Sequence, residues 1–267
     1  GFVSLERKRA NNMQRYFIDN KTAQVDERLE MDKEATHHML NVMRMQIGDQ
    51  VILVTQTEQV FIGELIGNEE KKAILRLVDY RVENKEIPID TTLFVGLPKG
   101  DKLEFIVQKA TELGARQIVP VSMRYSVTKW DQKKAGKKIA RLQKIAKEAA
   151  EQSHRTFVPI IEDLHSVSMV KNRLSDFNQV CIAYEEIAKE GEKSNLAQTY
   201  ATLKPTDKIA FITGPEGGIH PDEIASLTED LNHVHLCGLG PRILRTETAP
   251  LYLLSTLSFA TELLGWN

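Results

Sequence analysis

Two glycine-containing loops near the C-terminal end of the sequence hold the residue types best suited to binding a small ligand. Each follows a short apolar run typical of a buried strand, Lys208–Thr213 or His233–Cys237, and each precedes a helical pattern. Glycine has no Cβ, so it lets the backbone turn with positive φ and approach a ligand closely. If the two strands are neighbours in a parallel sheet, the loops form a ligand crevice at their carboxyl ends. The loops are Ile212-Thr213-Gly214-Pro215-Glu216-Gly217-Gly218-Ile219 and Leu239-Gly240-Pro241-Arg242-Ile243-Leu244-Arg245-Thr246-Glu247-Thr248-Ala249.

The second loop contains apolar residues that are unusual in a loop unless something covers them: Leu239, Ile243 and Leu244. An adenine ring lying between backbone and apolar side chains would cover them, and the glycines would expose N–H and C=O groups to its edge. The alternative is that the glycines only make tight turns while the leucines fill the core. That alternative is the better interpretation of either loop alone. The two loops in this order favour a ligand site.

Other familiar catalytic signatures are absent from the sequence. It has no Gly-x-Gly-x-x-Gly after the first strand of the second domain and no Gly-x-x-x-x-Gly-Lys-Ser/Thr phosphate loop. The seven histidines form no His-Glu-x-x-His pair and no cluster with cysteine, so we expect no metal site. Cys237 lies beside the second loop, where a nucleophilic role is conceivable. A small buried packing residue is the better interpretation.

The composition is that of a globular protein, with 42% hydrophobic and 27% charged residues, and 267 residues suit one large or two modest domains. No apolar run reaches the ~18 residues of a membrane span, and the N-terminus has no apolar core of a secretory signal. Both cysteines lie in apolar runs, as in proteins that keep their thiols reduced. We therefore expect a cytoplasmic protein with no membrane partner.

Positive charge is concentrated in one stretch although the net charge is −2. Between Lys129 and Lys147 the sequence has eight basic residues and one acid, Asp131. Such a stretch would create a local positive field suited to nucleic acid. The alternative is a helix face that is simply solvated.

The first third of the chain has the alternation of short β-strands, which is typical of a small barrel. One helix interrupts them, capped by Asp32 and ending before Gly48. Residues 1–12 lack apolar periodicity and are expected to be a disordered extension or cloning-derived. The segment 82–89 has the composition of a linker. The expected elements are strands at 16–18, 50–55, 59–66 and 73–80 and a helix at about 33–43.

After the linker, strands alternate with helices, which predicts an α/β domain with a mostly parallel sheet covered on both faces. The apolar spacing of the helix at 102–113 gives it one buried face, and Gly114 is placed to end it in the left-handed conformation. The expected strands are 92–97, 117–121, 157–161, 180–184, 209–213 and 233–237; the other helices are 132–152, 163–174, 221–231 and 247–264, and 185–194 is a polar loop.

The two loops resemble motifs 2 and 3 of the SPOUT (trefoil-knot) RNA methyltransferases, specifically the RsmE family, which methylates N3 of a uridine in 16S rRNA. The resemblance extends over nearly the whole chain, apart from the residues before Met13. The other matching segments are Met13-Gln14-Arg15-Tyr16-Phe17, His37-His38-Met39-Leu40-Asn41-Val42-Met43-Arg44 with Gly48-Asp49, Lys109-Ala110-Thr111-Glu112-Leu113-Gly114 and Glu148-Ala149-Ala150-Glu151-Gln152-Ser153-His154-Arg155.

The resemblance implies a PUA-like β-barrel RNA-binding domain at 13–84 and a SPOUT methyltransferase domain at 85–267, whose C-terminal chain forms a trefoil knot. It also implies a homodimer acting on 16S rRNA or the small ribosomal subunit. The cofactor would be S-adenosyl-L-methionine, bound between the loops. Its expected contacts are Thr213, Gly214, Pro215, Glu216, Gly217, Leu236, Gly238, Leu239, Gly240, Arg242, Ile243, Leu244 and Thr246.

We expect Arg245 and Glu216 to be catalytic. Arginine keeps its proton, so Arg245 would stabilise the anion that develops on uracil rather than act as a base. Arg242 would do the same or hold phosphate. Glu216 would accept a proton or balance the sulfonium charge; the alternative is that it caps the helix near Pro221. Expected RNA contacts are Arg15, Arg44, Lys134, Lys137, Arg141, Gln152, Ser153 and Arg155.

Two alternatives remain open from the sequence. The first is a catalytically inactive RNA-binding protein of the same fold. The second keeps the methyl transfer but changes the target to another RNA, such as tRNA, or to a ribose.

Overall fold

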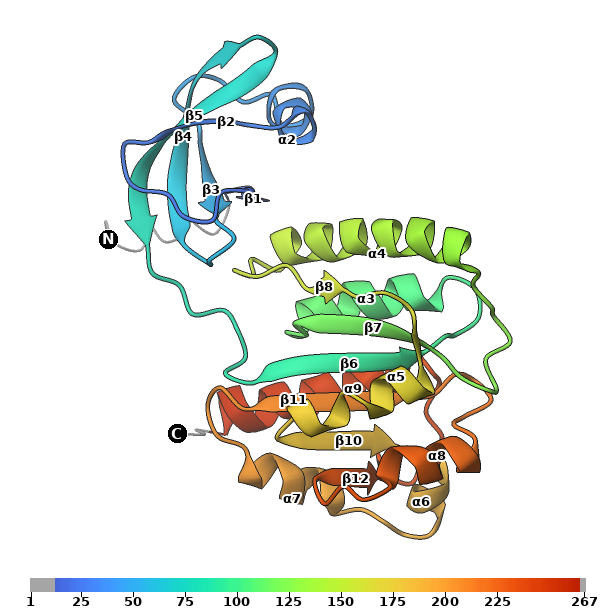
Figure 1. Ribbon diagram of the computed structural model, residues 1–267. Coiled ribbons are helices and arrows are strands. Elements are labelled where there is room, and N and C mark those ends of the chain that lie inside the picture. Colours follow the sequence, from blue (N-terminus) through green and yellow to red (C-terminus); the bar gives the residue numbers. More distant parts are fainter. Residues whose placement is uncertain (1–12, 265–267) are drawn as a thin grey trace. The chain divides into compact units, whose positions relative to one another are not determined.

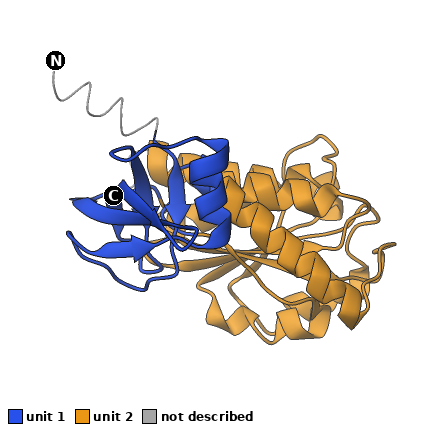
Figure 2. Ribbon diagram, turned by 90° about the horizontal axis from the view of Figure 1, so that it is seen from above, with its two compact units in different colours: residues 1–85, 150–157 blue, residues 86–149, 158–267 orange. Residues whose placement is uncertain are grey.

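The computed structural model describes residues 13–264, so the expectation for residues 1–12 lies outside the described residues. The described chain forms two compact units (Figure 2). Unit 1 comprises residues 13–85 together with 150–157, and unit 2 comprises 86–149 and 158–264. The sequence did not predict that residues 150–157, which comprise the end of the long basic helix and the chain just after it, belong to unit 1.

Unit 1 is built on a five-stranded sheet in the order β1-β3-β4-β5-β2 (Figure 1). Strands β1 and β3 are parallel and the other pairs are antiparallel. Strand β2 was not predicted, and within the described residues β1 and β2 remain the two edges of the sheet. The elements are β1 (Arg15–Phe17), β2 (Arg28–Glu30), α2 (Lys33–His37), η1 (His38–Val42), β3 (Gln50–Val54), β4 (Val60–Glu69) and β5 (Lys72–Arg81).

The predicted helix of unit 1 begins where its cap requires. The Asp32 carboxylate accepts a hydrogen bond from the backbone N–H of Ala35 at 2.7 Å, which satisfies one of the free donors of the first turn. After His37 the helix widens into the π-helical turn η1, and Arg44 follows with φ of 51°. Arg44 is exposed, as its expected RNA contact requires.

A buried arginine joins the strands of unit 1 to the segment 150–157. The Arg15 side chain is completely buried and donates to the Glu83 carboxylate at 2.8 and 3.1 Å and to the carbonyl of Arg155 at 3.0 Å. Thr156 Oγ1 donates to Glu58 at 3.1 Å. Arg155 is also buried. These positions correct the expectation that Arg15 and Arg155 contact RNA, because neither side chain is presented to solvent.

Unit 2 is an α/β domain whose sheet has the order β12-β10-β11-β6-β7-β8, with every strand pair parallel. Its elements are β6 (Asp90–Gly96), α3 (Lys102–Glu112), β7 (Gln117–Ser122), α4 (Gln132–Gln152, whose last three residues belong to unit 1), β8 (Ile160–Ile161), β9 (His165–Ser166), α5 (Val167–Lys171), η2 (Leu174–Asp176), β10 (Gln179–Ala183), α6 (Glu185–Lys189), α7 (Asn195–Thr202), β11 (Lys208–Thr213), α8 (Pro221–Thr228), β12 (Val234–Cys237), α9 (Thr248–Ser258) and η3 (Phe259–Leu263).

Three local predictions for unit 2 need correction. The stretch 185–194 is not a loop, since it contains helix α6, and the following helix α7 was not predicted. The strand predicted at 157–161 shortens to Ile160–Ile161. The helix predicted at 163–174 starts with the short strand β9 and continues as α5. Helix α4, by contrast, has the predicted bounds.

Two apolar layers cover the sheet of unit 2, as the alternating pattern predicted. Helices α3, α4, α7 and α9 pack on one face through a cluster that includes Ile106, Leu142, Tyr200 and Leu254. Helices α5 and α8 cover the other face, through Val170 and Leu227 among others. Figure 1 shows these helices on the two sides of the strands.

The C-terminal chain returns from the edge of the sheet to its middle. Strand β12 lies at the edge, yet α9 packs against α3 and β11. The buried hydroxyl of Tyr200 holds this helix, since it donates to the carbonyl of Leu253 at 2.8 Å and lies 3.0 Å from Thr256 Oγ1. This return after the last strand is what the expected C-terminal knot requires.

Helix α4 presents a basic face to solvent. Its buried residues Ala135, Leu142, Ala146 and Ala149 form one stripe, while Lys133, Lys134, Lys137, Lys138, Arg141 and Lys144 are exposed. The charge of Arg141 is already paired. The Arg141 guanidinium hydrogen-bonds Glu104 of α3, and this contact lowers the pKa of the Glu104 carboxyl. Arg141 is therefore a weaker candidate for phosphate than its lysine neighbours.

The buried Arg15–Glu83 pair should contribute strongly to the stability of unit 1. Replacing Arg15 by Ala leaves the Glu83 carboxylate and a carbonyl without their donor, so we expect the free energy of unfolding in urea to fall by about 3–5 kcal/mol. Arg28→Ala is the matched control, since Arg28 pairs with Glu69 on the surface and exposed pairs contribute little. Equal stability of the two variants would contradict this role.

Candidate functional site

Three parallel strands of unit 2 end at the candidate site. The sequence suggested that the two glycine loops follow neighbouring strands. The structure corrects this, because β10 lies between β11 and β12. Since all three strands run in the same direction, their carboxyl ends meet at one edge of the sheet, where ligands of open α/β sheets bind.

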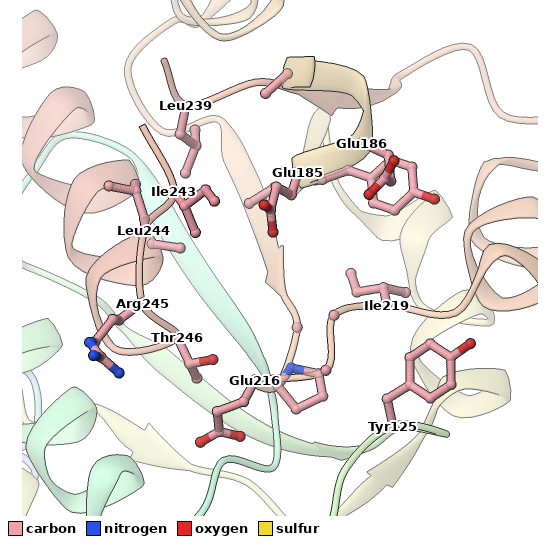
Figure 3. A pocket seen from close by; sticks show the side chains of 18 of the residues that line it. Tyr125, Glu185, Glu186, Glu216, Ile219, Leu239, Ile243, Leu244, Arg245 and Thr246 are labelled. Atoms are coloured by element: carbon pink, nitrogen blue, oxygen red, sulfur yellow. The ribbon is translucent and has the colours of Figure 1, made fainter. Parts of the chain in front are cut away.

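A cavity of about 680 Å³ opens at this edge (Figure 3). This volume lies within the ~300–1,000 Å³ of typical small-molecule sites. The two glycine loops both contribute to its wall. The predicted residues that line it are Gly214, Pro215, Glu216, Gly217, Leu239, Gly240, Arg242, Ile243, Leu244, Arg245 and Thr246.

Three predicted cofactor contacts do not line the cavity. Thr213 is buried at the end of β11, Leu236 lies within β12, and Gly238 lies at the start of the second loop.

Sequence reasoning missed the contribution of other elements. The end of β10 supplies Ala183, the chain after it supplies Tyr184, Glu185, Glu186 and Ala188, the chain after β7 supplies Tyr125, and α3 supplies Lys102. No pattern in the sequence indicates the residues at and after β10, because their place depends on the strand order of the sheet. Strand β10 precedes both loop-bearing strands in the chain, yet it lies between them in the sheet.

A close backbone crossing holds the second loop in place. A Cβ on Gly238 would lie 2.3 Å from the carbonyl oxygen of Glu192 and 3.1 Å from Ala188, so only glycine fits there. The Glu192 carboxylate accepts from the backbone N–H of Gly238 at 3.1 Å, and also from those of Ser194 and Asn195 at the start of α7. Burial raises the pKa of Glu192, but these donors outweigh it, so the pKa is lowered and the carboxylate stays charged.

Two other glycines leave room at the cavity wall. Gly218 and Gly240 adopt φ of 81° and 93°, and no heavy atom lies within 4 Å of the position that a Cβ would take on either. Both line the cavity. Their backbones are therefore open to close approach by a ligand, which is the feature expected of a nucleoside-binding loop.

Glu216 is held by two donors at one end of the cavity. Its Oε1 accepts from the backbone N–H of Lys99 at 2.9 Å and from Lys102 Nζ at 3.0 Å. Burial raises the pKa of Glu216, but the bond from Lys99, together with Lys102, more than compensates and lowers the pKa. The alternative capping role is not what the structure shows, since His220 caps α8 and accepts from the N–H of Asp222.

Arg242 and Arg245 differ from the other arginines of unit 2. Arg116, Arg124, Arg141 and Arg173 each form an ion pair with a carboxylate. Among the described residues, none pairs with the side chain of Arg242 or Arg245, and both of these side chains are exposed and line the cavity. In Figure 3 Arg245 and Glu216 lie at the same end of the pocket, on either side of Thr246.

Both units match known protein families. Residues 85–258 match the model of the RNA methyltransferase domain, and residues 32–78 match that of the RNA methyltransferase PUA domain. Over 254 residues the chain is 46% identical to ribosomal RNA small subunit methyltransferase E (RsmE) of Bacillus subtilis strain 168, covering 94% of this chain and 98% of that protein. The chain belongs to the RsmE family of RNA methyltransferases.

Solved structures of RsmE-like proteins share the fold. RsmE from Neisseria gonorrhoeae, bound to S-adenosylmethionine, is 26% identical with a TM-score of 0.78, covering 92% of this chain and 97% of that one. A Legionella pneumophila protein in complex with the same cofactor is 28% identical with a TM-score of 0.80, covering 93% and 98%. These similarities confirm the predicted architecture of a PUA-like domain followed by a SPOUT α/β domain, with which the predicted knot is consistent.

The structure does not support a nucleophilic role for Cys237. Cys237 is fully buried, as predicted, and its hydrogen bond with Cys181, together with burial, raises the pKa of its thiol, so it stays protonated. In residues 13–264 no group of three His, Cys, Asp or Glu side chains could hold a metal ion. No helix in that range is long and apolar enough to cross a membrane.

The crossing at Gly238 generates a stability prediction. In Gly238→Ala the new methyl group collides with backbone rather than with a flexible side chain, so the free energy of unfolding should fall by about 1–3 kcal/mol. The control is Gly136→Ala in helix α4, where a Cβ meets no atom within 4 Å. Because alanine has the higher helix propensity, this change should raise the free energy of unfolding by as much as about 1 kcal/mol. Thermal and urea denaturation measure both. A Gly238→Ala protein as stable as the parent would show that the crossing is loose.

Proposed function

We propose that this protein transfers the methyl group of S-adenosylmethionine to N3 of a uridine in the 16S rRNA of the small ribosomal subunit. The observation that carries the proposal is the cavity that both glycine loops form at the ends of β10, β11 and β12. The identity to an enzyme named for small-subunit rRNA methylation supports the substrate. The alternatives are an inactive RNA-binding module and another RNA target. The name of that relative does not favour another target, and the presence of the glycines and of Arg245 at the cavity does not favour an inactive module.

The residues present fit the cofactor. The open backbones of Gly218 and Gly240 suit close contact with a nucleoside, and Leu239, Ile243 and Leu244 provide apolar cover for an adenine ring. The carboxylates of Glu185 and Glu186 also line the cavity and suit hydroxyl or ammonium groups. When bound, S-adenosylmethionine supplies an electrophilic methyl group on a sulfonium.

Arg245 is assigned to the uracil. Uridine N3–H is a weak acid, so methylation needs the proton to leave to solvent while the negative charge on the imide is stabilised. N3 then forms a bond to the methyl carbon as the carbon–sulfur bond breaks and its electrons stay on sulfur. The unpaired guanidinium of Arg245 can donate to the uracil oxygens, and Arg242 can do the same or hold a phosphate.

Glu216 is assigned to a fixed negative charge rather than to proton transfer. A carboxylate whose pKa is lowered is a poor proton acceptor at neutral pH. Its bonds to Lys99 and Lys102 hold the charge at the cavity wall, where it can balance the positive sulfonium.

RNA contacts are assigned mainly to the exposed polar residues of each unit. In unit 1 these are Arg44 and Gln152, together with the half-buried Ser153, and in unit 2 they are Lys134 and Lys137 of α4, with a smaller share for the paired Arg141. Phosphate contacts position RNA, and a uridine must leave its stack to reach the cavity.

We further propose a cytoplasmic homodimer that completes the site across its interface. A monomer in sedimentation equilibrium would contradict this proposal.

The activity is tested on small subunits from a strain that lacks the enzyme. Incubation with the parent protein and S-adenosylmethionine should produce N3-methyluridine in 16S rRNA, measured by mass spectrometry of nucleosides. Arg245→Ala should lower kcat by about 10²–10³-fold, as for loss of a donor to a developing anion, while calorimetry shows an unchanged Kd for the cofactor. A variant that methylates at the parent rate would remove the assignment of Arg245.

The basic face of α4 is tested by charge reversal. Lys134→Glu with Lys137→Glu should weaken binding to a 16S rRNA transcript and lower the magnitude of the slope of log affinity against log salt concentration by about 1.4–1.8, since each lost phosphate contact removes about 0.7–0.9. Arg141→Gln is the comparison, and should change the slope less because Glu104 already neutralises that guanidinium. Unchanged affinity at all salt concentrations would exclude this face.

A further inference from the structure

An aromatic side chain from outside both glycine loops lines the cavity. Tyr125 lies in the segment that follows β7, and 44% of its surface is exposed. In Figure 3 it stands with Ile219 on one side of the pocket, and Leu239, Ile243 and Leu244 stand on the other. The apolar residues that suit the cofactor's adenine and this tyrosine are therefore on opposite walls.

The chain around Tyr125 is firmly held. The backbone N–H of Arg124 donates to Glu223 at 3.1 Å, and the Arg124 guanidinium pairs with Asp222 at 3.1 Å, both at the start of α8. A Cβ on Gly217 would lie 2.8 Å from Tyr125 Cβ, so the first glycine loop packs directly against this residue. The backbone that carries the Tyr125 ring is therefore in place before a ligand binds, which lowers the entropy cost of binding.

One side of the Tyr125 ring is occupied within the protein. The ring packs against His220 with centroids 5.1 Å apart and planes tilted by 53°. Because the residue is nevertheless almost half exposed and borders the cavity, ring surface remains available to a planar ligand. Aromatic side chains on nucleic-acid-binding proteins use such a surface to stack on unpaired bases.

The same segment leads directly into the basic helix. From Tyr125 the chain runs through Lys129 to α4, whose exposed lysines suit phosphates. A strand of RNA positioned by that helix would therefore approach the cavity on the side of Tyr125. We infer that Tyr125 is the stacking platform for the target pyrimidine base, a substrate contact that rests on the proposed function.

The inference is tested with Tyr125→Ala, Tyr125→Phe and the control Phe105→Ala, in the full chain. Phe105 is also 44% exposed but does not line the cavity. We expect Tyr125→Ala to raise KM for 16S rRNA, and Kd for the same transcript in filter binding, by ~5- to 150-fold. Tyr125→Phe should keep the parent values because it keeps the ring, and Phe105→Ala should match the parent.

Calorimetric titration with S-adenosylmethionine supplies the deciding comparison. The cofactor Kd of Tyr125→Ala should equal that of the parent, and an equal loss of cofactor and RNA affinity would place the ring on the cofactor and overturn the inference. Unchanged RNA affinity, or a Tyr125→Phe variant as weak as Tyr125→Ala, would also overturn it. If the parent makes no N3-methyluridine, the proposed function fails, whereas the binding measurements still decide whether the ring holds RNA.

Discussion

The crossing of two backbones at Gly238 is the constraint on which the rest of unit 2 depends. The chain leaving β12 passes so close to Glu192 that no side chain fits, and the Glu192 carboxylate binds the N–H groups of both crossing segments. The second loop reaches the cavity and α9 reaches α3 only beyond this point. The Glu192 carboxylate is only partly buried, but its hydrogen bonds to Gly238, Ser194 and Asn195 tie the two crossing segments to each other.

The insertion of β10 between the two loop-bearing strands explains the character of the cavity. If β11 and β12 were neighbours, the loops would face each other across a single strand spacing of about 4.8 Å. With β10 between them the gap is doubled, and the end of β10 adds Tyr184, Glu185 and Glu186 to its floor and wall. The site is therefore wide enough for a nucleoside and has polar groups that neither loop supplies.

Local patterns predicted the elements well, and long-range pairing accounts for the errors. Helix α4 has its predicted bounds because its apolar stripe and its charges keep one helical period. Helix α6 was missed because 185–194 is mostly polar, with only Ile187 and Ala188 as apolar side chains and no helical period of apolar residues. The burial of Arg15 depends on Glu83, which is 68 residues away, and the position of β10 depends on a strand order that differs from the chain order. Periodicity contains neither kind of information.

The distribution of paired charges separates structural arginines from chemical ones. A guanidinium that already neutralises a carboxylate, as Arg141 does with Glu104 or Arg173 with Glu162, has little attraction left for a developing anion. Within the described part of unit 2 the arginines without such a partner are Arg242 and Arg245, and both border the cavity. Keeping an exposed cation unpaired costs little in water, yet its interaction with an anion strengthens once a ligand excludes that water. The two unpaired arginines of unit 2 thus lie where the proposed reaction would develop negative charge.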